Sequence, residues 1–204
     1  TAWYASFWQF CVTYLTHLKE DDWCLSAEQS LSAHAENWTV PRQLIVRATK
    51  ARNNVTPLPH DTSLLVVRAE MPGENRIVVK KGLRLYALPS ALITCSPEYF
   101  RRNPTDMRAA LSMVRDASEV LAPLLEGGHS TIAGRLSGAF RNIGKDQLAY
   151  EILTTMRAAG YDVRATDPFE NRVRLPAGTQ KFSRYVHRML LLWQEMRVTR
   201  IDRC

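Results

Sequence analysis

The sequence predicts an α+β fold, with N-terminal helices, a small, mostly antiparallel sheet of about four strands and then a C-terminal helical bundle. Three observations predict it. Apolar residues recur at helical spacing near both ends of the chain. Runs rich in β-branched residues lie between residues 43 and 87. The order of elements is helices, strands, helices, which is typical of α+β folds and not of alternating α/β folds.

The length and the composition predict how the chain is divided. With 204 residues, 46% of them hydrophobic and 23% charged, it is expected to fold as one large domain or two small ones. Residues 1–95 are expected to form an α+β part and residues 96–170 a helical part packed on it. Residues 171–204 are expected to form a basic C-terminal helix or linker.

The first elements are predicted to be helical. Residues 2–18 carry apolar side chains at positions i, i+3 and i+4, which indicates an amphipathic helix. Ser26 is expected to cap a short helix over residues 27–35, and Gln29, three residues on, completes a capping box.

Strands are predicted in the middle of the chain. The candidates are Gln43–Ala48, Leu64–Ala69, Arg76–Lys80 and Leu83–Ala87. Lys81 and Gly82 predict a tight turn between the last two. Pro57 and Pro59 favour a loop between strands.

Helices are predicted again from Pro89 onward. Ser96-Pro97 is typical of a helix start, and Thr105 opens a helix whose apolar contacts extend from Leu111 to Leu125. Gly127 and Gly128 end that helix, and Ser130 or Thr131 is expected to cap the next. Gly144 ends that one in turn, and another helix runs from about Lys145 to Ala159. A short strand is expected over Tyr161–Ala165 and a final helix over 182–196.

The middle helix of this region has small side chains on one side. These residues are Ala133, Gly134, Ser137, Gly138 and Ala139. They predict a close contact with another helix or with a sheet.

The cysteines, the hydropathy and the charge bear on location and partners. The cysteines are scattered, which indicates small buried thiols in a reducing compartment, and no apolar run is long enough to predict a membrane span. A cytoplasmic location without a membrane partner is therefore expected. Eight basic residues against Glu195 and Asp202 in 172–204 supply most of the net charge of +7. That segment predicts either nucleic-acid contacts through Arg184, Arg188, Arg197 and Arg200, or a solvated helix face or linker.

The standard catalytic signatures are missing from the sequence. It holds no phosphate-loop or dinucleotide motif, and the histidines and cysteines lack metal-ligand spacing. No catalytic residue, cofactor or metal is therefore predicted, and the chain is not expected to be an enzyme by itself. The glycine-rich turn leaves two alternatives open: an anion site on Gly127, Gly128, Ser130 and Thr131, with Arg135 nearby, or a capped helix start with surface arginines. A small enzyme that holds a phosphate at this turn is a further alternative.

A family resemblance covers most of the chain. Within residues 106–169, LLEGGHSTIAGRLSGAFRNIG and MRAAGYDVRATDPFE resemble the N-terminal regulatory region of long bacterial Fic (cell filamentation) proteins. The earlier segments FWQFC, WCLSAEQSLSAH, TVPRQLIVRATKARNNVTPLPHDTSL and GLRLYALPSALI resemble the same region. That region is similar in turn to AbiEi-type antitoxins, which share the order of a serine-led helix (here Ser26 and His34), an extended segment (Pro41–Ala48) and a strand-to-helix junction (Leu83–Leu92).

The resemblance implies a function. Fic enzymes transfer AMP to protein hydroxyls with a His-Pro-Phe/Tyr-x-Asp/Glu-Gly-Asn-Gly-Arg motif, and this chain lacks that motif. We therefore expect a non-catalytic, antitoxin-like regulatory module that packs on a Fic adenylyltransferase domain, in the same chain or in a partner. The small-residue helix over 132–143 is expected to take part in that docking, on the catalytic part or on a second copy in a homo-oligomer. The alternative is a DNA-associated transcriptional regulator of the AbiEi antitoxin type.

Overall fold

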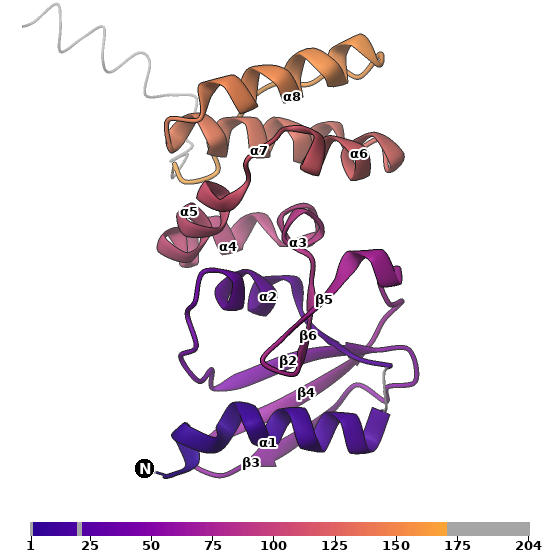
Figure 1. The fold of residues 1–204 in the computed structure, drawn as a ribbon, viewed down its shortest axis with the longest axis vertical. Coiled ribbons are helices and arrows are strands. Elements are labelled where there is room, and N and C mark those ends of the chain that lie inside the picture. Colours follow the sequence, from indigo (N-terminus) through magenta and orange to yellow (C-terminus); the bar gives the residue numbers. More distant parts are fainter. Residues whose placement is uncertain (1, 20–21, 171–204) are drawn as a thin grey trace, which may run out of the picture. The chain divides into compact units, whose positions relative to one another are not determined.

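Two N-terminal helices, a strand-rich middle and a C-terminal run of helices make up the computed structural model, which describes residues 2–19 and 22–170 (Figure 1). The predicted α+β class is confirmed. The helix predicted over 182–196 lies outside the described residues.

Helix α1 (Ala2–Lys19) confirms the first predicted element and covers one face of the larger sheet. Its apolar stripe buries Phe7, Cys11 and Leu15 completely. These side chains belong to the same buried cluster as the inward residues of β2 (Gln43–Ala48) and β4 (Thr62–Arg68). Trp3 ties the start of the helix to the sheet, because its Nε1 donates a hydrogen bond of 3.2 Å to Thr62 Oγ1.

The larger sheet has the strand order β1-β2-β4-β3, where β1 is Cys24–Leu25 and β3 is Asn54–Leu58. Its central strands β2 and β4 run parallel, and the outer pairs are antiparallel. Strand β2 matches its predicted bounds, since buried and less buried residues alternate along it. The loop predicted at Pro57 and Pro59 is confirmed at Pro59, which begins the turn before β4, but it is wrong at Pro57, which lies in β3. Pro57 is tolerated because β3 is an edge strand that pairs with β4 alone.

Strands β5 (Ile77–Lys80) and β6 (Leu83–Tyr86) form the predicted hairpin as a separate sheet. Its turn residues, Lys81 and Gly82, both have positive φ, 52° and 79°. Positive φ at both central positions defines the turn type that matches strand twist. A short 3-10 helix, η1 (Glu74–Arg76), precedes the hairpin.

Helix α2 (Ala27–His34) begins at the predicted cap. Ser26 Oγ accepts a hydrogen bond of 3.3 Å from the Gln29 backbone N–H. The other half of the predicted capping box is not formed, because the Ser26 N–H donates to the Ile45 carbonyl of β2 instead. The start of α2 is thus fixed to the sheet.

The helical region differs from its prediction at one break. The helix predicted from Thr105 with contacts as far as Leu125 is two helices, α5 (Pro104–Met113) and α6 (Ser118–Glu126). The turn between them is stabilised by its own carboxylates, since Glu119 Oε1 accepts the N–H groups of Arg115 and Asp116. The remaining helices are α3 (Leu88–Thr94), α4 (Pro97–Arg102), α7 (Ser130–Asn142) and α8 (Asp146–Ala158).

The small-residue face of α7 makes its close contact with an irregular segment, 163–167. A Cβ atom built on Gly138 would lie 2.1 Å from the Thr166 carbonyl oxygen, and one on Gly134 would lie 2.2 Å from that of Arg164. The Thr166 N–H also donates to the Gly134 carbonyl. The predicted partner, a helix or a sheet, is therefore corrected, and so is the short strand predicted over 161–165.

The buried hydrophobic residues of unit Thr1–Glu170 form two clusters. One lies between α1, the larger sheet and the hairpin, and the other between α2 and the helices that follow it. Helix α2 contributes to both, with Leu31 in the helical cluster and Ala33 in the sheet cluster. The helical cluster takes residues from both sides of Cys95. None of the helices among residues 2–19 and 22–170 is long and apolar enough to span a membrane.

Candidate functional site

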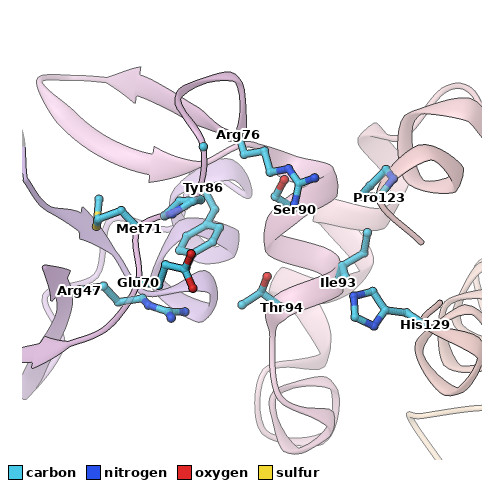
Figure 2. A pocket seen from close by; sticks show the side chains of 12 residues that line it. Arg47, Glu70, Met71, Arg76, Tyr86, Ser90, Ile93, Thr94, Pro123 and His129 are labelled. Carbon is cyan, nitrogen blue, oxygen red and sulfur yellow. The ribbon is translucent and has the colours of Figure 1, made fainter. Parts of the chain in front are cut away.

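A cavity of about 410 Å³ lies between the strand-rich region and the helices (Figure 2). The strand-rich wall is built from polar side chains of separate elements. Arg47 extends from β2, Tyr86 from β6 and Arg76 from the end of η1, and Glu70 stands in the loop after β4. These residues come from elements that are far apart in the sequence, so no local motif reveals them, and together they place both signs of charge on this wall.

The opposite wall is helical. Ser90, Ile93 and Thr94 lie on one face of α3, because residues three and four apart share a face. Pro123 of α6 and His129, just before α7, complete this wall. In Figure 2 the His129 ring points toward α3 and lies next to Ile93.

Arg47 is the arginine of this site that has a buried N–H group without a hydrogen-bond acceptor. Its guanidinium lies 5.7 Å from the centroid of the Tyr86 ring, within reach of a cation–π contact. Its Nε atom is buried, and no residue of the described part accepts a hydrogen bond from it. Burial raises the pKa of the Tyr86 phenol to about 12, although the charge of Arg47 acts in the opposite direction. Tyr86 is therefore a neutral hydroxyl at physiological pH.

Arg76, by contrast, already has a partner. It forms an ion pair with Glu126, the last residue of α6, and so links η1 with the helices at the edge of the cavity. Both side chains are substantially exposed, 44% and 63%, which makes the pair a weak contributor to stability. Glu126 therefore compensates Arg76, and Arg47 keeps no such counter-ion among the described residues.

The glycine-rich turn contributes to the cavity, but through a residue that the sequence analysis did not select. The backbone N–H groups of Gly127, Gly128, His129 and Ser130 donate to carbonyls of Pro123, Leu125, Leu124 and Gly128. These groups are therefore satisfied inside the chain, and fewer donors remain for an anion than predicted. Neither Ser130 nor Thr131 caps α7, whose cap residue is His129. The His129 ring folds over Gly127, where a Cβ would lie 2.1 Å from its Nε2.

Arg135, the last member of the predicted anion site, has a different role. It lies 5.4 Å over the Phe100 ring and donates a 3.4 Å hydrogen bond to the Cys95 carbonyl. Burial lowers the pKa of its guanidinium. Arg135 therefore packs α7 against the residues around α4, and it is not a lining residue of the cavity.

The other predicted sites have simple outcomes. Arg184, Arg188, Arg197 and Arg200 lie outside the described residues. Cys11, Cys24 and Cys95 are buried free thiols, as predicted, and burial raises their pKa values to about 12, 11 and 12. In the part of the chain that the structure describes, no group of three His, Cys, Asp or Glu residues is placed to hold a metal ion.

Sequence reasoning missed Arg47, Glu70, Arg76, Tyr86 and His129 as a group. One signal was present: Arg47 is the single charged residue in the strand QLIVRA. The others come together only through tertiary contacts. A comparison with protein families, curated proteins and solved structures found no match.

Proposed function

We propose that this chain is a non-catalytic, antitoxin-like regulatory module that acts by packing on a Fic-type protein adenylyltransferase domain, in the same chain or in a partner. The resemblance over residues 106–169 and the missing catalytic motif support the proposal. The buried thiols support a cytoplasmic location.

The observation that carries the packing function is an apolar row on the outer face of the larger sheet. Val55, Leu65 and Ile45 are register neighbours across β3, β4 and β2. They point away from the face that α1 covers, because side chains alternate along a strand. Val55 is 52% exposed and Ile45 is 37% exposed. None of the three packs against either buried cluster.

The outer sheet face replaces α7 as the docking surface in this proposal. The small-residue side of α7 is covered by residues 163–167 of the chain itself. A branched apolar row on an uncovered sheet face is the type of surface that protein partners bury. The catalytic domain is the proposed occupant.

The test is AMP transfer by a Fic catalytic domain encoded in frame with this chain or next to it. We expect the chain to change the rate or the choice of protein substrate. The double variant Ile45→Thr/Val55→Thr keeps β-branched residues in the sheet and should weaken that effect. Val78→Thr/Val79→Thr on β5 is the matched control, since those valines are also exposed, 38% and 65%. The proposal would be refuted if adding the chain changed neither the rate of AMP transfer nor the choice of protein substrate.

A second proposal rests on the basic residues of 172–204. If these arginines contact phosphates, the full chain should be retained on duplex DNA, and the retention should weaken steeply as salt rises. No retention at low salt would exclude a DNA-associated regulator.

A further inference from the structure

We infer that the cavity between β2, the loop after β4 and α3 binds a small organic molecule through one oxyanion group, a phosphate or a carboxylate. Arg47 lies on the same face of β2 as Ile45, two residues further along, but the inference rests on the cavity and does not depend on the proposed regulatory function. Its volume of about 410 Å³ falls in the range of small-molecule sites, which is roughly 300–1,000 Å³.

The group of the site that favours an anion is the guanidinium of Arg47. Of its two arginines, Arg76 is neutralised by Glu126, whereas Arg47 forms no ion pair with any described residue. A buried N–H without a partner is costly, and Arg47 Nε is such a group. An incoming oxyanion would supply that hydrogen-bond acceptor and the counter-charge together. Guanidinium groups match the geometry of carboxylates and phosphates for this purpose.

The helical wall offers further hydrogen-bonding groups to the same anion. Ser90 and Thr94 present hydroxyls four residues apart on α3, and His129 adds an imidazole ring that points toward α3 next to Ile93 (Figure 2). Arg47 faces them from the strand-rich wall. An oxyanion between the walls would therefore be held by a cation on one side and by neutral polar groups on the other.

Glu70 restricts the ligand further. Its carboxylate lies on the same wall as Arg47, where it would repel a second negative group of the ligand and accept a hydrogen bond from a ligand hydroxyl or amine. The ligand expected is thus a molecule with one anionic group and a neighbouring hydroxyl or amine. Two probes differ only in the anionic group: glycerol 3-phosphate and glycerate. Inorganic sulfate is the control for a bare anion.

The experiment is calorimetric titration of the full chain with each probe at constant ionic strength. Saturable binding of glycerol 3-phosphate alone identifies a phosphate ligand, and that of glycerate alone a carboxylate ligand. Arg47→Gln should weaken the binding by about tenfold or more, and Thr94→Val by about fivefold, as expected for losing a charged and a neutral hydrogen bond. Arg101→Gln should change nothing, because Arg101 is an arginine of α4 that does not line the cavity.

Thr94 is exposed on α3, so Thr94→Val tests the site without risk to the core if Arg47→Gln fails to fold. Circular dichroism should show both variants folded like the unmodified chain. Saturable binding of neither probe, or binding that survives both substitutions in folded protein, would overturn the inference. Sulfate binding as tight as that of both probes would overturn it as well.

Discussion

At the scale of single residues, the positions that tolerate substitution least are glycines against which backbone atoms pack. Gly134 and Gly138 lie one helical turn apart on α7, and carbonyls of residues 164 and 166 rest directly on them. A clash with backbone is harder to relieve than a clash with a flexible side chain, because the segment is held by further bonds. Arg157 donates to the Val163 carbonyl, and Asn142 to the Asp167 carboxylate.

Gly138→Ala should lower the free energy of unfolding by about 2 kcal/mol, since overpacking outweighs the gain in helix propensity. Gly73→Ala is the control, because Gly73 has an ordinary φ of −56° and its new Cβ would meet only the Asn75 side chain. Urea unfolding of both variants measures the difference. Equal losses in the two variants would contradict the steric explanation.

At the scale of elements, two serines that precede helices differ in whether their side chains cap the helix. Ser26 and Ser96 both precede helices and were both predicted as helix starts. Ser26 Oγ accepts the Gln29 N–H, whereas Ser96 makes no side-chain capping bond at α4. Pro97 already fills the first position of α4, where its missing N–H costs nothing.

Ser26→Ala should therefore lower the free energy of unfolding by about 1 kcal/mol, the usual value of a lost cap. Ser96→Ala should stay within about 0.5 kcal/mol of the unmodified chain. Thermal or urea unfolding of the two variants side by side measures this contrast. A loss at Ser96 as large as that at Ser26 would argue against capping as the cause.

Elements with a strong local pattern were predictable from the sequence, and those that depend on distant contacts were not. The periodicity of residues 2–18 and the alternation in Gln43–Ala48 gave correct bounds to within a residue. Strand β3 was missed because nothing local shows that Pro57 lies at a sheet edge. The cavity was missed for the same reason, since Arg47 and His129 are brought together by packing alone. The turn 127–131 was predicted as an anion site because of its backbone N–H groups, and His129, which lines the cavity, was not predicted as a site residue.

At the scale of the whole molecule, α2 and β6 connect the two buried clusters, because each contributes residues to both. Cys24, Leu31 and Tyr86 lie early in the chain, yet they pack with Phe100, Leu111 and Phe140. A fragment that ended at residue 95 would expose this apolar surface to water.

We therefore expect residues 1–170 to unfold in one cooperative transition and the fragment 1–95 to show none. Circular dichroism against urea concentration measures both. A cooperative transition in 1–95, with native-like helix content, would contradict this expectation and would make residue 95 a true domain boundary. Residues 1–170 carrying Leu31→Ala should lose about 2–5 kcal/mol, which tests the same contact without truncation.

The three buried thiols give this molecule chemical reporters of its own opening. Cys11 lies in the sheet cluster, and Cys24 and Cys95 lie in the helical cluster. Their raised pKa values keep them protonated, so an alkylating reagent at neutral pH meets almost no thiolate until the surrounding core separates. The alkylation rate of each cysteine therefore reports how often the cluster around it opens. Equal rates at Cys11 and Cys95 would mean that both clusters open in one event.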